Sequence, residues 1–150
     1  MGLFPRRLAA ASALLCLGLF ACADPRPPTG RWEGVYEDSS VIIVARLEIT
    51  PDGKVRVSAP NAITTESALS PAQRIGFVRE LQTRLDASWP AVAPLPLEFD
   101  GSVFRKPGGV APQLEWDAGR KRMTMVYYSG NRNSVRVVLS AVVEFGEPNS

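Results

Sequence analysis

Alternating apolar and polar residues predict that most of the chain after residue 30 forms β-strands. The clearest segment is 40–50, in which Val41 to Val44 are continuously apolar, a pattern typical of a strand covered on both faces. Beyond this run the pattern alternates, which predicts that Arg46 lies on a solvent-exposed face. The same two patterns predict about seven strands, at residues 31–37, 40–50, 54–59, 97–106, 113–117, 121–128 and 134–145.

The segment 134–145 carries the longest apolar stripe of the chain. Val135 and each second residue up to Phe145 share one face, which predicts a central core strand. Short turns link most of the strands. In the turn at 50–54, Pro51 presets φ and Gly53 permits a positive φ, and further turns are predicted at 117–120 and 129–133.

One amphipathic helix is predicted between residues 70 and 89. Ser70 is suited to the N-cap, Pro71 to the first helical position, and Gln73 completes a capping box. Pro90 ends the helix. At 100° per residue one side of the helix gathers the apolar residues Ile75, Phe77, Val78, Leu81, Leu85 and Trp89.

Two strand meanders separated by one helix, without βαβ spacings, predict an α+β fold that is mainly β. We expect a curved antiparallel sheet or an incomplete small barrel of about seven strands, with the amphipathic helix inserted mid-chain. The helix is expected to cover the open side or end of the sheet. Residues 31–150 would form this single β-rich globular domain.

The first residues have the pattern of an export signal. Arg6 and Arg7 precede 13 uncharged residues, a stretch too short to span a membrane but suited to a secretory signal. The sequence Leu19-Phe20-Ala21-Cys22 that follows resembles the lipobox of bacterial lipoproteins. The resemblance implies that residues 1–21 are a cleaved signal peptide and that the Cys22 thiol is lipidated. The alternative is ordinary cleavage after Ala23, which would give a soluble periplasmic or secreted protein.

The lipobox resemblance also implies a location. Residues 22–30 would form the lipidated cysteine and a Pro-rich tether to the membrane. In Gram-negative lipoproteins an Asp directly after the cysteine favours inner-membrane retention, whereas Ala23 stands here, so the resemblance implies the outer membrane facing the periplasm. Cleavage would remove two of the 17 basic residues and none of the 15 acidic ones, so the mature chain is neutral and no nucleic-acid partner is expected.

The residue inventory disfavours an enzyme. The chain contains no His, Cys16 would leave with the signal peptide, and no motif of an activated serine occurs. Paired carboxylates occur at Glu98 with Asp100 and at Glu115 with Asp117, but they alternate with apolar residues and read as a solvated sheet face. We therefore predict no catalytic residue, metal or cofactor, and a carboxylate-based hydrolase is the least favoured reading.

The sequence Gly30-Arg31-Trp32 resembles the G-x-W motif of lipocalins and other calycins. In that family the tryptophan closes one end of the barrel and an arginine of a late strand packs on it. The resemblance implies that Trp32 and Arg136 form a barrel-closing pair. The alternative is that Trp32 only plugs the base of a small barrel.

Basic and aromatic residues near two predicted loops are candidates for recognition, because Arg and Tyr are enriched at binding hot spots. The first loop has two basic residues before a Gly-Gly pair, which would expose backbone N–H groups to an anion. The candidate binding surface consists of Arg105, Lys106, Tyr128, Asn131 and Arg132.

Taken together, these patterns favour a non-enzymatic envelope lipoprotein that contacts another envelope protein or a surface polymer. The alternative is a carrier whose lipocalin-like barrel holds a small apolar ligand. The two hypotheses differ in the barrel interior, since a carrier needs an open cavity and an interaction module has a filled one.

Overall fold

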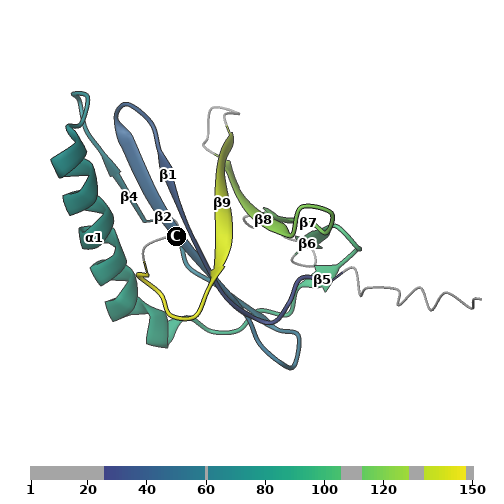
Figure 1. The fold of residues 1–150 in the computed structure, drawn as a ribbon. Coiled ribbons are helices and arrows are strands. Elements are labelled where there is room, and N and C mark those ends of the chain that lie inside the picture. The colour runs from purple at the N-terminus through teal and green to yellow at the C-terminus, as the bar shows by residue number, and fades with distance from the viewer. Residues whose placement is uncertain (1–25, 60, 106–112, 129–133, 148–150) are drawn as a thin grey trace, which may run out of the picture.

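The computed structural model describes residues 26–59, 61–105, 113–128 and 134–147. The chain is mainly β with one α-helix in its middle, as the sequence predicts (Figure 1). The elements are β1 (Gly30–Glu37), β2 (Val41–Ile49), β3 (Val55–Val57), β4 (Asn61–Thr64), α1 (Pro71–Ser88), the short 3₁₀ helix η1 (Trp89–Ala91), β5 (Glu98–Phe99), β6 (Val103–Arg105), β7 (Gln113–Asp117), β8 (Arg122–Tyr128) and β9 (Ser134–Val142).

The strands form one antiparallel sheet in the order β3-β2-β1-β9-β8-β7-β6-β5, and β4 pairs with β2 beside β3. Two meanders, β1 to β3 and β5 to β9, are joined by pairing between β1 and β9. The sheet is open and strongly curved, so that the two meanders form the two sides of a half-barrel (Figure 1). The predicted curved sheet or incomplete barrel is therefore confirmed, and β9 is central in it.

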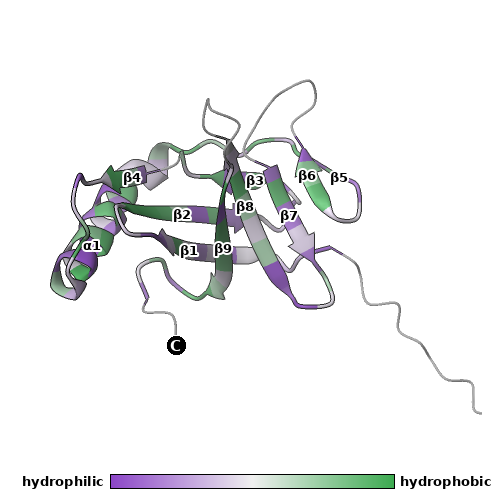
Figure 2. Ribbon diagram, turned by 90° about the horizontal axis from the view of Figure 1, so that it is seen from above, coloured by the Kyte–Doolittle hydropathy of each residue, from purple (hydrophilic) through white to green (hydrophobic). Residues whose placement is uncertain are grey.

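The bend between the two sides is located at Gly34. Seen from above, β9 crosses the direction of β1 and β2 at a steep angle (Figure 2). An ideal Cβ on Gly34 would lie 2.1 Å from the carbonyl oxygen of Val138, so only glycine lets β9 pass at this distance. Pairing between β1 and β9 consequently covers only Arg31 to Glu33, against Ser140 to Val142.

Helix α1 begins as its sequence predicts. The Ser70 side chain accepts a hydrogen bond from the Gln73 backbone, and the Gln73 side chain accepts one from the Ser70 backbone. Arg74, in the first turn of the helix, contacts the β1–β2 turn, where its guanidinium donates to the Asp38 carbonyl and pairs with Glu37 at 3.4 Å. The start of the helix is thus fixed to the sheet by both local and long-range contacts.

Apolar residues pack on both faces of β2, as its continuous apolar run predicts. Ile43 and Leu47 face the concave side, where they join a cluster that includes Trp32 and Trp116, whose rings meet edge to face at 5.7 Å. Ile42 and Val44 face the convex side and pack against Leu81 and Leu85 of α1. The helix therefore lies on the outer face of β2 and β4, and not over the open side of the sheet as expected (Figure 1).

Three strand predictions need correction. Segment 97–106 is not one strand but the β5–β6 hairpin, because Gly101 has a φ of 100° and the Asp100 carboxylate accepts the N–H groups of Ser102 and Val103. Strand β4, residues 61–64, was not predicted at all. Strand β9 ends at Val142, so Phe145 does not continue its inner face. Among the described residues, no helix is long and apolar enough to cross a membrane.

Candidate functional site

A groove of about 750 Å³ runs between the N-terminal half of α1 and the outer face of β1. Val35 of β1 and Val78 of α1 provide apolar lining, and Ile75 stands at the groove with 60 % of its surface exposed. Sequence periodicity places Ile75 on the core side of the helix, but Ile75 does not join the cluster in which Leu81 and Leu85 pack against β2. The residues lining the groove are Glu33, Val35, Glu37, Pro71, Arg74, Ile75, Val78, Arg79, Gln82, Gly146 and Glu147.

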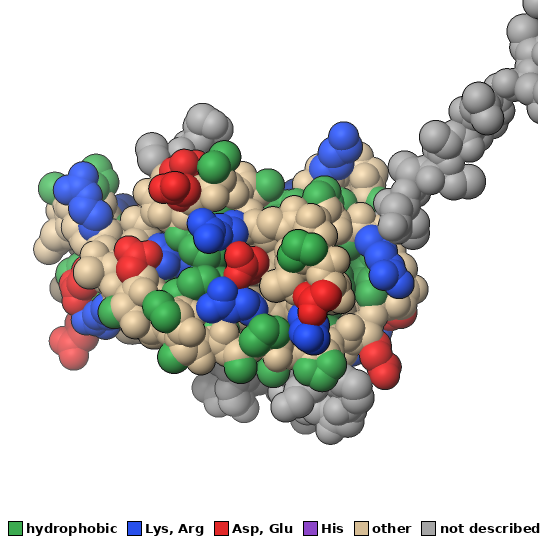
Figure 3. Space-filling view, turned by 90° about the horizontal axis from the view of Figure 1, so that it is seen from below, with side chains coloured by type: hydrophobic (Ala, Val, Ile, Leu, Met, Phe, Trp, Pro, Cys, Tyr) green, Lys and Arg blue, Asp and Glu red, His purple; other side chains and the backbone are tan. Residues whose placement is uncertain are grey.

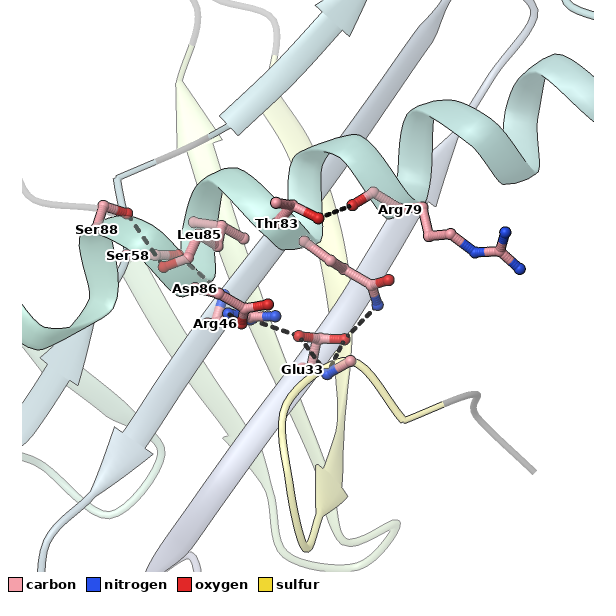
Figure 4. Close-up of polar contacts among 10 residues, drawn as sticks. Glu33, Arg46, Ser58, Arg79, Thr83, Leu85, Asp86 and Ser88 are labelled. Atoms are coloured by element: carbon pink, nitrogen blue, oxygen red, sulfur yellow. Dashed lines mark hydrogen bonds and ion pairs between the residues drawn. The ribbon is translucent and has the colours of Figure 1, made fainter.

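One end of the groove is closed by a buried ion pair. Glu33 of β1 is 2 % exposed and Arg46 of β2 is fully buried, and the Arg46 Nε donates to Glu33 at 2.5 Å. Both carboxylate oxygens of Glu33 accept further hydrogen bonds, from the Gln82 side chain at 2.8 Å and from the Gly146 N–H (Figure 4). Since the lone pairs of Glu33 are occupied by protein donors, this carboxylate is a structural group and not an available base.

The segment after β9 covers the other side of Arg46. The Phe145 ring centroid lies 4.7 Å from the Arg46 guanidinium carbon and 4.7 Å from the Trp89 ring. Asp86 of α1 accepts a hydrogen bond from the Arg46 Nη1 at 2.6 Å (Figure 4). Strand β2, helix α1 and the C-terminal segment are therefore held together at one guanidinium.

The burial of Arg46 corrects the predicted solvent-exposed face of β2. Arg46 has the same strand parity as Ile42 and Val44, so it continues the face that α1 covers. Because Val41 to Val44 are apolar on both faces, the sequence already indicated that the face carrying Ile42 and Val44 is covered. Arg46 lies two residues after Val44 on the same face, so the same pattern could have predicted that it is buried. The Ser58 hydroxyl, also buried, accepts the Arg46 backbone N–H at 2.9 Å.

The charges at the groove have both signs. Glu37 stands at one side with its side chain 40 % exposed, and Arg79 of α1 extends its guanidinium away from the helix (Figure 4). On the face seen from below, Lys and Arg side chains are interspersed with Asp and Glu side chains (Figure 3). The groove is therefore distinguished by its apolar lining and exposed isoleucine rather than by net charge.

The predicted binding surface is only partly described. Arg105 is exposed and pairs with Asp100 at 3.5 Å, and the strands that carry Arg105 and Tyr128 end at the same end of the sheet with β7 between them. The Tyr128 side chain, Lys106, Asn131 and Arg132 lie outside the described residues, as do Cys22 and the whole leader.

The structure does not bring Trp32 and Arg136 together. Trp32 faces the inner cluster and is opposite Ala141 in the β1–β9 register. Arg136 lies on the other face of β9, where its guanidinium pairs with Glu115 of β7. Trp32 packs instead against Trp116, so it plugs the inner face as a core residue.

Three carboxylates of the predicted pairs, Asp100, Glu115 and Asp117, have structural partners. Asp100 and Asp117 each accept backbone N–H groups in a turn, and these hydrogen bonds lower the pKa of both carboxyls. A lowered pKa is the opposite of what a general acid requires. Within the described parts of the chain, no three His, Cys, Asp or Glu residues gather as a metal site would require.

Comparison with models of known families, with curated proteins and with solved structures finds no match to this chain.

Proposed function

We propose that this protein is a non-enzymatic lipoprotein of the cell envelope that binds a partner through the groove between α1 and β1. The observation that carries the proposal is an exposed Ile75 standing over an apolar-lined groove, on a helix whose other half is firmly packed. Exposed apolar residues at a hollow between two elements are typical of recognition sites, because burying them on binding stabilises the complex.

The inner face of the half-barrel supports an interaction module over an apolar-ligand carrier. Trp32, Trp116, Met123 and Met125 are between 0 % and 7 % exposed and pack together on the concave side. A carrier would need this space for its ligand. The groove lies on the opposite, convex side of β1, together with the helix.

The binding site is tested with a photo-crosslinking amino acid in place of Ile75, introduced into the full chain in its own cells. Arg84 provides the matched control, because it lies nine residues further along α1 and therefore half a rotation away, on the solvent side. We expect a discrete crosslinked adduct at position 75 and none at position 84. Equal adducts, or none at position 75, would remove the groove as the binding site.

The membrane attachment is tested separately with Cys22→Ala. Under the lipoprotein proposal, acyl chains on Cys22 anchor the domain, so the variant should move from the membrane fraction to the soluble fraction. Unchanged detergent partitioning of the variant would refute lipidation, and would leave the groove proposal in place.

A further inference from the structure

We propose that the groove holds an extended segment of a partner protein, which joins the sheet as an additional strand beside β1. This inference rests on the proposed function and identifies the conformation of the partner. It starts from the strand pairing, because within the described parts of the chain residues 35–37 of β1 have a strand partner, β2, on one side only. On the other side, the described pairing with β9 stops at Glu33, where β9 turns away across Gly34.

The free edge of β1 and the groove adjoin each other. Val35 and Glu37 belong both to the unpaired stretch and to the groove lining. A strand added at this edge would place every second side chain on the convex face, under the same helix that covers β2. Ile75 would then cover the added strand as Leu81 covers β2, which accounts for its 60 % exposure without a partner.

The residues at the edge define the side chains that fit. A side chain opposite Val35 would enter the apolar part of the groove, so an aliphatic residue fits there. Two positions away on the same face, a basic residue would meet Glu37, whose contact with Arg74 is long at 3.4 Å. For an antiparallel strand this order reads, from N- to C-terminus, basic residue, any residue, aliphatic residue.

A second copy of this chain fits the edge less well. If two β1 edges paired around Tyr36, Glu37 would be opposite Val35 and would meet no basic residue. Pairing around Val35 would need the edge at Glu33, which β9 already occupies. A partner with a basic residue opposite Glu37 avoids both arrangements.

The test uses a displayed library of random dodecapeptides, selected on the purified full chain in detergent. We expect enrichment of peptides with a basic residue two positions before an aliphatic residue. A selected peptide should bind Ile75→Asp at least about tenfold more weakly than wild type, whereas binding to Arg84→Ala should not change. Repeating the selection on Glu37→Lys should replace the basic residue by an acidic one, provided circular dichroism shows the native fold.

Strand addition is distinguished from other binding modes by methylating single backbone nitrogens of the selected peptide. In a strand only alternate N–H groups point to the neighbouring strand, so methylation should weaken binding about tenfold at every second residue and leave the residues between unaffected. Such alternation would confirm an added strand.

Other outcomes overturn the inference in distinguishable ways. Uniform tolerance of methylation, or losses spaced three to four residues apart, would show a peptide bound without strand pairing and would refute the added strand. No enrichment over a blank surface would also refute it, as would an Ile75-dependent dimer in sedimentation. If a peptide binds without strand pairing, or if no peptide is enriched, crosslinking at position 75 still decides whether the groove binds a partner.

Discussion

The two halves of α1 meet the sheet in different ways. In the C-terminal half, Leu81 and Leu85 are 0 % and 2 % exposed against β2, and Asp86 binds the buried Arg46. In the N-terminal half, Ile75 stands over an open groove. Both halves carry the same amphipathic pattern, so the difference arises from the strands below them. We infer that one half stabilises the fold and that the other is left available for recognition.

The largest effect should come from breaking the charged contact under the C-terminal half. Arg46→Ala leaves Glu33 buried without its cation, and removing one member of a buried pair costs about 3–5 kcal/mol. We expect a loss of that size in the free energy of unfolding, measured by urea denaturation. Arg84→Ala removes only an exposed pair with Glu80 and should cost less than about 1 kcal/mol. Equal losses from the two substitutions would mean that the buried contacts of Arg46 do not stabilise the packing of the C-terminal half of α1 on the sheet.

Truncating one apolar residue in each half compares them directly. Leu81→Ala creates a cavity between α1 and β2 and should cost about 2–5 kcal/mol. Ile75→Ala removes a mostly exposed side chain and should change the free energy of unfolding by less than about 0.5 kcal/mol. If the two substitutions cost the same, the N-terminal half is packed and the groove cannot be a free binding site.

The elements that the sequence predicts well are those fixed by neighbouring residues. Ser70, Pro71 and Gln73 specify the start of α1 within four positions, and the turn at 50–54 is set by its own Pro and Gly. Strands β7, β8 and β9 follow from an alternation with a period of two residues, which is visible within a short stretch of sequence. Local patterns of this kind were sufficient for the fold class and for the central position of β9.

The groove depends on contacts that no local pattern contains. Its residues come from β1, α1 and the segment after β9, which lie far apart in the sequence. Phe145 has the parity of the inner stripe, yet it lies over Arg46 once β9 has ended. Strand β4 was also not predicted, because its four residues form a strand through long-range pairing with β2 rather than through a local pattern.

A pair of glycines tests whether the bend at Gly34 creates the free edge. Gly34→Ala places a methyl group against the Val138 backbone carbonyl, so β9 must shift, and we expect a loss of about 1–3 kcal/mol in urea denaturation. Gly76→Ala, in α1 with open space around it, should stabilise the protein by about 0.5–1 kcal/mol. A neutral Gly34→Ala would show that β9 does not depend on this close passage.

The smallest expected effect concerns the β1–β2 turn above the N-terminal half of α1. Backbone hydrogen bonds from Ser40 and Val41 hold the pKa of Asp38 below its ordinary 3.8. A carboxyl whose pKa is lower in the folded protein adds stability above the unfolded pKa and loses it as the pH falls through the folded one. Asp38→Asn should therefore be slightly less stable than wild type at pH 7, and the difference in denaturation midpoint should shrink as the pH falls below 3.8 and vanish once the pH is below the lowered pKa of the folded protein.

Asp52→Asn is the matched control for this turn. Lys54 and Thr50 lower the pKa of Asp52 to about 2, in the β2–β3 turn, away from α1. Both variants should lose an acid-dependent part of their stability, but only Asp38→Asn removes the carboxylate charge beside Arg74 and should weaken binding at the groove. If Asp52→Asn weakened binding equally, the loss of binding would come from lower overall stability. The proposal that the N-terminal half of α1 has a separate role in binding would then be contradicted.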